Sequence, residues 1–461
     1  MQPTIEELRA RYGARYKWLL LTTVMIGTMA SILSSTIVNV AVPDLSQHFV
    51  LGQERAQWVS AGFMLAMTLS MLTTPWLLLR YGLRRTYGGA TLLLLFGGVV
   101  GGFSVNFPML LSMRVVEGLA AGILQPIPAI VVMRAFGAEE QGKAMGIFGF
   151  GVVLAPALGP SVGGFLVEHF GWRSIFFVVV PFCLVVLFMV RRWLAVNSPL
   201  MGEAKALDWK GLLLASVGTM ALLNGLVHLH DSLAQALGML ALAGVSLAGF
   251  VVYQLRAEHG LMNMKLFHYR QFAMGALVAF IYGAGLFGST YLLPVYMQMA
   301  LHYAPSQAGL LLLPPGIVLA FTIVAAGRLA DRFAPNVLVS VGLGLLALSF
   351  ALMALGSSSS GYFTLMAWTI IGRIGLGFVL PSLSLGAMRG IEVGMIAQGV
   401  SIINFMRQLG GAIGVSLVGI VLEWRISASQ APARVPAAGV PEAARIHAFN
   451  ETFLLVALLC A

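Results

Sequence analysis

One acidic side chain lies in the middle of a long apolar stretch of this chain. Glu117 falls within the run 108–133, and Arg114 precedes it by three residues. Residues three apart on a helix share a face, so the two side chains should meet. Burial favours the neutral form of Glu117, whereas Arg114 favours its carboxylate. We interpret Glu117 as a proton carrier and Arg114 as its modulator; the alternative is a permanent ion pair that neutralises a buried arginine.

Other kinds of chemistry have little support in the sequence. His228, His230 and Asp231 form the one local cluster that resembles metal ligands, but a site needs at least three convergent ligands, and a loop is the better interpretation. The sequence has no Gly-Lys-Ser/Thr loop for phosphate, so it does not indicate ATP-driven chemistry. We expect no metal, no cofactor and no enzymatic activity.

The composition indicates that lipid is the solvent of this chain. Hydrophobic residues make up 59% and charged residues 10% of the sequence, and the mean hydropathy is +0.90. A soluble domain has about 25% charged residues, because its surface must be solvated. The net charge is +10, but the basic residues are scattered between apolar runs. That pattern is typical of membrane topology and not of nucleic-acid binding.

Apolar runs long enough to cross a bilayer extend along the whole chain. The hydropathy pattern predicts fourteen spans, at 18–42, 57–79, 87–105, 108–133, 144–167, 174–193, 211–229, 234–254, 272–299, 307–326, 337–355, 362–388, 396–423 and, incompletely, 450–461. The basic residues between spans concentrate on the side of the N-terminus, which places the N-terminus in the cytoplasm. The last span is so short that we expect a truncated or half-spanning helix.

A weak internal repeat predicts the domain organisation. Arg114-x-x-x-Gly118 recurs as Arg373-x-x-x-Gly377, and the joint around Gly82 recurs at a similar offset. Repeated halves are typical of secondary transporters. We therefore expect a six-helix half at 1–200, an inserted hairpin at 201–260 and a second half at 261–461.

Several motifs occur in a characteristic order. They are Thr36–Pro43, Arg114–Gly118, Ala157–Gly164, Pro305–Gly309 after Gln298, Gly327–Arg332 and Asn404–Gly411. With them the chain resembles the fourteen-spanner drug:proton antiporters of the major facilitator superfamily over nearly its whole length. The resemblance implies an all-α polytopic membrane protein with the major facilitator fold, in a bacterial cytoplasmic membrane. It also implies multidrug efflux of hydrophobic or amphipathic compounds by proton antiport with alternating access.

Two motifs of the resemblance carry conformational roles. The antiporter motif of Gly159, Pro160, Gly163 and Gly164 would allow close helix approach and a kink; the alternative is that its glycines only pack helices. The cytoplasmic latch would comprise Gly327, Asp331 and Arg332, with Gly82 and Arg84 as the first-half counterpart. Its alternative is a set of solvated loop charges.

The sequence departs from the family at two acidic positions. Ser34 stands where the first helix of the family commonly has an acid, and Leu79 stands where the first-half loop has one. Glu117, in turn, stands where the family more often has Gln. These departures leave Glu117 as the midspan acid available for a proton, or indicate that proton coupling was lost.

The resemblance also implies a central substrate cavity. Its candidate residues are Ser34, Asn39, Phe63, Gln125, Tyr282, Tyr291, Gln298, Asn404, Arg407 and Gln408. Three midspan arginines against one glutamate favour anionic or neutral compounds. The alternative function is a dedicated exporter of one endogenous metabolite or antibiotic, not necessarily proton-coupled. In a two-membrane bacterium, a periplasmic adaptor protein is a further possible partner.

Overall fold

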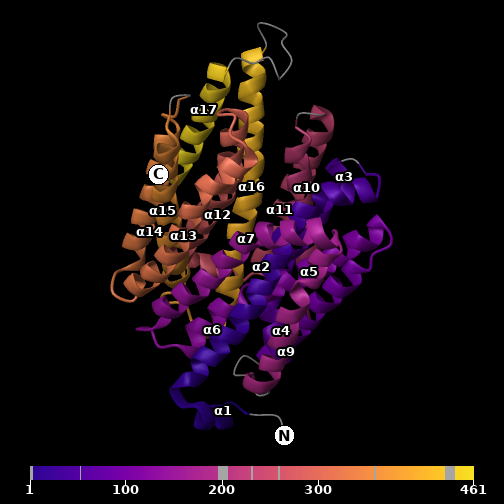
Figure 1. Cartoon of the computed structure of the whole chain (residues 1–461). Helices are drawn as coiled ribbons and strands as arrows, with labels where there is room; N and C mark the ends of the chain where they lie inside the picture. Colours follow the sequence, from indigo (N-terminus) through magenta and orange to yellow (C-terminus); the bar gives the residue numbers. More distant parts are fainter. Residues whose placement is uncertain are drawn as a thin grey trace. The chain divides into compact units, whose positions relative to one another are not determined.

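The computed structural model describes residues 4–51, 53–195, 206–229, 232–257, 260–357, 360–430 and 442–461. Every regular element in these ranges is helical (Figure 1). The first helices are α1 (Ile5–Tyr12), α2 (Tyr16–His48), α3 (Gln53–Ser70), α4 (Thr74–Gly102), α5 (Phe107–Leu124), α6 (Ile127–Ala135), α7 (Gln141–Phe170), α8 (Ser174–Phe177) and α9 (Val179–Trp193). They are followed by α10 (Trp209–Val227), α11 (Leu233–Arg256), α12 (Arg270–Met299), α13 (Pro305–Ala330), α14 (Pro335–Met353), α15 (Tyr362–Ala387), α16 (Ile396–Gln430) and α17 (Glu442–Cys460). Short 3-10 turns lie at Gly13–Arg15, Met71–Thr73, Met264–His268 and Val393–Met395.

Eleven helical stretches of the described residues are long and apolar enough to cross a membrane. One of them, Arg55–Gly102, has 48 residues. A straight helix of that length would measure about 72 Å, against about 30 Å of hydrocarbon. The stretch is broken at Gly82, whose φ of 73° and ψ of 172° are not helical and suit glycine. It therefore covers the two predicted spans 57–79 and 87–105, while the total of fourteen remains a prediction.

The helices form two compact units. Unit 1 comprises 1–216, 250–268 and 390–405, and unit 2 comprises 217–249, 269–389 and 406–461. In unit 1, α3 and α4 pack on α5, and α2 packs on α7 and α9. In unit 2, α15 packs on α13 and α14, and α17 packs on α14 and α12. The domain boundaries expected at residues 200 and 260 remain predictions.

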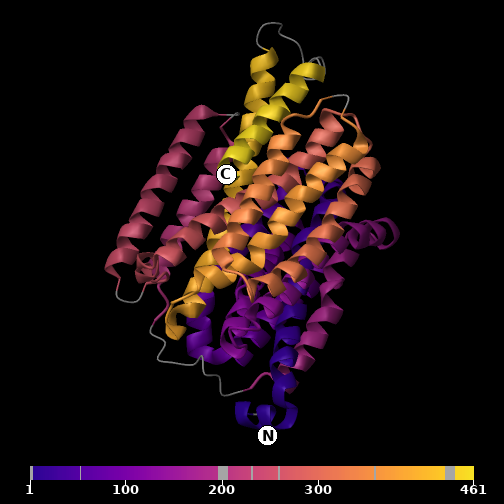
Figure 2. The same ribbon diagram turned by 90° about the vertical axis from the view of Figure 1, so that its left-hand side faces the viewer.

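Two helices, α10 and α11, occupy the region of the predicted inserted hairpin, and Figure 2 shows them side by side; their status as an insertion between two halves remains a prediction. Small residues bring the two helices together, as in many membrane helix pairs. A Cβ on Gly218 would lie 2.7 Å from the Leu247 side chain, and one on Gly225 would lie 2.9 Å from Leu240. Glycine at these two positions therefore sets the spacing of the hairpin.

The last helix is longer than predicted. The sequence predicts a half-span at 450–461, but α17 begins at Glu442 and has 19 residues, or about 28 Å. Its first turns were not predicted because polar residues lower their hydropathy; α17 is not among the eleven candidate spans, so the half-spanning helix remains a prediction. Those residues have partners in unit 2: Asn450 donates to the Gly356 carbonyl at 2.9 Å, and Glu451 pairs with Arg425 at 3.1 Å.

Candidate functional site

The buried charges of unit 1 lie on α5. The helix starts after Asn106, whose side chain accepts a hydrogen bond from the Met109 amide at 2.9 Å and so caps it. Arg114 and Glu117 follow two and three turns later, on one face. Their side chains are 0% and 1% exposed, so the pair lies fully inside the protein.

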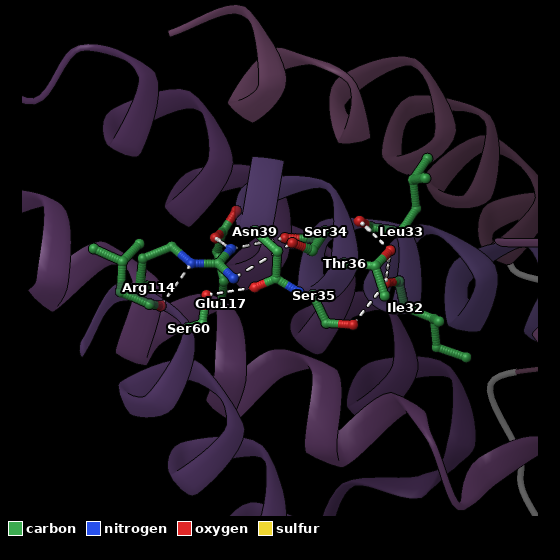
Figure 3. Close-up of polar contacts among 10 residues, drawn as sticks. Ile32, Leu33, Ser34, Ser35, Thr36, Asn39, Ser60, Arg114 and Glu117 are labelled. Carbon is green, nitrogen blue, oxygen red and sulfur yellow. Dashed lines mark hydrogen bonds and ion pairs between the residues drawn. The ribbon is translucent and has the colours of Figure 1, made fainter. Parts of the chain in front are cut away.

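Arg114 joins three helices through its guanidinium group (Figure 3). Its Nη1 lies 2.5 Å from Oε2 of Glu117 and donates to Oγ of Ser34 on α2 at 3.0 Å. Its Nε donates to the Val59 carbonyl on α3 at 3.2 Å, and the group stacks on the Phe63 ring at 4.2 Å. A buried arginine with this many partners is well compensated even apart from its carboxylate.

One of the two carboxylate oxygens of Glu117 has a hydrogen-bond partner among the described residues, and the other has none. Oε2 accepts from Arg114, whereas Oε1 is buried and has no hydrogen-bond partner among the described residues. Two glycines of α4 make room for this side chain: a Cβ on Gly97 would lie 2.6 Å from Cγ of Glu117, and one on Gly98 would lie 3.4 Å from Oε1. A buried carboxylate oxygen without a donor is the atom on which a proton would be most stabilising.

The other candidate cavity residues of unit 1 are less closely connected. Asn39 accepts a hydrogen bond from Ser60 at 2.7 Å, next to the Arg114 cluster in Figure 3. Gln125 contacts the Met67 sulfur at 3.6 Å, and its Oε1 is buried without a partner. Asn404 donates to the Val400 carbonyl of its own helix. Of the candidate cavity residues in unit 1, Ser34 and Phe63 contact Arg114 of the charged pair directly.

The remaining cavity candidates lie in unit 2. Tyr282 is 2% exposed and lies within electrostatic range of Arg373 and Arg407. Gln408 is buried, whereas Tyr291 and Gln298 are exposed on α12. The candidates are thus divided between the two units, and a common cavity remains a prediction.

The antiporter-motif glycines differ from one another in what they contact. A Cβ on Gly159 would lie 2.5 Å from the Thr36 hydroxyl, and one on Gly163 would lie 2.7 Å from Ile37, both on α2. A Cβ on Gly164 would meet nothing within 4 Å. Pro160 lies in the same helix. Gly159 and Gly163 therefore let α7 approach α2 closely, while Gly164 has no such role.

The latch candidates occupy the ends of helices. Arg84, two residues after the break at Gly82, donates to the Arg191 carbonyl at the end of α9 at 3.4 Å. In unit 2, Gly327 lies in the last turn of α13, Asp331 is its C-cap residue, and Arg332 is exposed. A latching role for these residues remains a prediction.

Metal-ligating side chains do not gather in the part of the chain that the structure describes: it contains no group of three or more His, Cys, Asp or Glu. His228, in the turn after α10, bonds to the Asn224 carbonyl of that helix, and His230 and Asp231 lie outside the described residues. The expectation of no metal therefore stays an expectation.

Several contributors to the site were not predicted from the sequence. The Val59 carbonyl, Ser60 and the glycines Gly97 and Gly98 all contact the charged cluster or its neighbour. The glycine pair in the third span was the available signal, because adjacent glycines in a membrane helix often mark a close approach.

Comparison with known proteins gives a consistent result. The family model of the Major Facilitator Superfamily matches residues 24–415. The "Multidrug resistance protein B homolog" of Mycobacterium tuberculosis is 31% identical over 426 residues, which cover 89% of this chain and 78% of that protein. The "Riboflavin transporter RibZ" of Clostridioides difficile is 27% identical over 406 residues, 87% of each chain.

The fold has solved counterparts. The crystal structure of the human organic anion transporter MFSD10 (TETRAN) superposes with a TM-score of 0.68 and covers 96% of this chain and 99% of its own, at 17% identity. Agreement at this identity concerns the fold alone, and it confirms the predicted all-α architecture.

Proposed function

Because the chain belongs to the major facilitator superfamily, we propose that it is a multidrug efflux pump that exports hydrophobic and amphipathic compounds in exchange for protons. It is a multi-pass membrane transporter and not an enzyme. The name of its mycobacterial relative supports export of several compounds. We place it in a bacterial cytoplasmic membrane with the N-terminus inside, and a periplasmic adaptor protein would be a partner only in a two-membrane bacterium.

The buried pair of Arg114 and Glu117 carries the proposal. A proton would bind Glu117 at Oε1, the oxygen that lacks a donor. The neutral acid would no longer compensate Arg114, but Ser34, the Val59 carbonyl and the Phe63 ring would still stabilise the guanidinium. The cluster therefore tolerates both protonation states, as a proton carrier must.

The positions of the Arg114 partners, Ser34, Val59 and Phe63, would couple protonation of Glu117 to conformational change. They belong to α2 and α3, whereas the pair is on α5. Once Glu117 is protonated, the charge of Arg114 is stabilised by its contacts with α2 and α3 instead of by the carboxylate. Protonation therefore changes the relative stability of two conformations that differ in how α5 packs against these helices. The competing interpretation, a permanent ion pair, predicts that the charge of the cluster never changes during transport.

The balance of membrane-embedded charge favours anionic or neutral compounds. Arg114, Arg373 and Arg407 lie within spans, and Glu117 is the corresponding acid. The central cavity that the family resemblance implies would, with that balance of charge, discriminate against dications by repulsion.

A dedicated exporter of one metabolite is the second candidate. The similarity to a riboflavin transporter favours it, since the same scaffold can serve a single compound. The breadth of the compounds transported separates the two candidates.

Everted membrane vesicles with an acidified interior test the proposal. A panel of hydrophobic anions, neutral compounds and cations is added while internal pH is followed with a fluorescent dye. We expect several compounds to release protons from wild-type vesicles and none to do so from Glu117→Gln vesicles. Glu139→Gln, at an exposed site between α6 and α7, removes the same charge and should behave like the wild type. Undiminished proton release by Glu117→Gln would falsify the role of Glu117, and release by one compound alone would favour the dedicated exporter.

A further inference from the structure

A cavity of about 690 Å³ lies within unit 1, away from the Arg114 cluster. Its wall comes from Leu72 and the start of α4, from residues 206–208, from the end of α11, from residues 260–265 and from Gln398 on α16. The candidate span Trp209–Val227 begins beside this wall, and the span Leu233–Arg256 ends in it. The cavity therefore lies at the level where helices leave the apolar part of the membrane. Trp209, 69% exposed, suits the same level, because Trp residues concentrate at membrane interfaces.

Two polar residues of the wall, Asp208 and Gln254, are hydrogen-bonded to each other and to backbone amides. Asp208 accepts hydrogen bonds from the Gly211 amide at 2.8 Å, from Nε2 of Gln254 at 2.7 Å and from the Leu261 amide at 3.1 Å. Oε1 of Gln254 accepts from the Met262 amide at 3.1 Å. These bonds satisfy both side chains and join the ends of α10 and α11 to the segment after them. Asp208 and Gln254 therefore shape the wall and are not available to a ligand.

The cavity also carries cationic side chains at its rim. Arg256 and Lys265 line it, and both are exposed. Arg80 lies close by, with its guanidinium 5.7 Å from the ring of Trp76, another lining residue. Among the described lining residues, Arg256 and Lys265 bring two positive charges against the one carboxylate of Asp208, so their net charge is positive. A ligand of this cavity should be anionic.

Besides the polar residues Asn263 and Gln398, the wall contains apolar side chains that continue onto the outer face of α11. Leu79 and Leu255 line the cavity and are 37% and 65% exposed. Val251 and Val252, one turn before Leu255, are 45% and 49% exposed. An apolar strip thus extends from the cavity along a membrane-spanning helix, in the direction of lipid acyl chains.

We propose that this cavity binds an anionic phospholipid, with its phosphate on Arg256 and Lys265 and an acyl chain along Leu79 and Leu255. The cationic rim suits the phosphate of such a lipid, and the apolar strip suits an acyl chain. A small soluble anion would use the cations but not the apolar strip, and a zwitterionic lipid would bring its own positive charge to the rim. This site is separate from the proposed proton site, so either proposal can fail without the other.

Native mass spectrometry of the purified full chain tests the proposal. The protein is titrated with phosphatidylglycerol and, separately, with phosphatidylcholine. We expect one phosphatidylglycerol to be retained more tightly than phosphatidylcholine. The double variant Arg256→Gln/Lys265→Gln should weaken its retention about 25-fold, at about fivefold for each basic residue at the membrane surface. Arg9→Gln/Arg11→Gln, at exposed positions of α1, removes the same charge and should retain the lipid.

Two further measurements distinguish an anionic phospholipid from a small soluble anion. Leu79→Ser/Leu255→Ser should weaken phosphatidylglycerol retention without any change of charge. Soluble glycerol 3-phosphate should compete poorly. Equal retention of the two lipids, equal loss in both charge variants, or displacement by glycerol 3-phosphate at similar concentration would each overturn the proposal. If the double variant unfolds, the single change Lys265→Gln at an exposed position gives the same comparison, with an expected loss of about fivefold.

Discussion

Nη1 of Arg114 lies 3.0 Å from Oγ of Ser34, so the first helix of unit 1 meets the buried charge pair at this residue. Ser34 is also the position where the family that the sequence resembles commonly has an acid. Here the Ser34 hydroxyl accepts a hydrogen bond from Arg114. The carboxylate that faces Arg114 comes from Glu117 on the arginine's own helix instead of from α2.

A carboxylate moved from position 117 on α5 to position 34 on α2 should still pair with Arg114. In the double variant Ser34→Asp/Glu117→Gln, the new carboxylate on α2 would face Arg114 across the same gap. We expect this variant to recover compound-induced proton release that Glu117→Gln alone has lost, as followed by the dye in everted vesicles. Ser35→Asp/Glu117→Gln is the control, because the Ser35 hydroxyl bonds to the Ile32 carbonyl and not to Arg114. Equal recovery in both double variants would show that position relative to Arg114 is irrelevant.

Removing Arg114 alone should destabilise the protein severely. Arg114→Leu leaves the Glu117 carboxylate buried without its partner, at a cost of about 3–5 kcal/mol. The double variant Arg114→Leu/Glu117→Leu removes both charges and should regain most of that stability. Thermal unfolding of the detergent-solubilised protein gives the comparison. A double variant no more stable than Arg114→Leu would mean that the neutral partners of Arg114, and not its charge, dominate its contribution.

The three glycines of the antiporter motif should respond differently to the same substitution. Gly163→Ala places a methyl group against Ile37, where overpacking costs about 1–3 kcal/mol. Gly159→Ala should behave similarly, because its methyl group would meet Thr36. Gly164→Ala meets nothing and should be neutral or slightly stabilising, since alanine favours the helix. Unfolding temperatures and transport rates of the three variants test this order; an equal loss in Gly164→Ala would contradict it.

Asp208 should contribute to stability as a cap and as a cross-link. Asp208→Ala removes the acceptor of the Gly211 amide at the start of α10, which is worth about 0.5–2 kcal/mol, and frees Gln254 and the Leu261 amide as well. We expect a lower unfolding temperature and faster proteolysis near residue 260. Glu139→Ala, at an exposed position, is the matched control. Unchanged proteolysis in Asp208→Ala would show that its bonds do not restrain this segment.

The helical architecture was predictable because lipid imposes long apolar runs, and these runs are visible in the sequence. The start of α17 was not, because Asn450 and Glu451 interrupt its apolar run. Their partners, Gly356 and Arg425, come from other parts of the fold, so only the folded protein shows why polar residues are tolerated there.

The charge pair itself was predictable from its spacing of three residues, which brings side chains together on any helix. Its surroundings were not. The contacts of Arg114 with Ser34 and Phe63 depend on how three helices are rotated about their axes. A hydropathy profile does not contain this rotation. The same limit applied to Gly163 and Gly164, which are adjacent in sequence but of which only the first approaches α2.

The location of both buried charges on α5 has a consequence for biogenesis. A charged residue at the centre of a span costs about 2.5–3.5 kcal/mol to transfer from the translocon into lipid. Arg114 and Glu117 are one turn apart on a single helix, so they can neutralise each other while α5 is still alone in the bilayer. A pair split between α2 and α5 would require both helices to be inserted and docked first. The i, i+3 arrangement therefore lets the segment enter the membrane in its own right and find Ser34 and Phe63 afterwards.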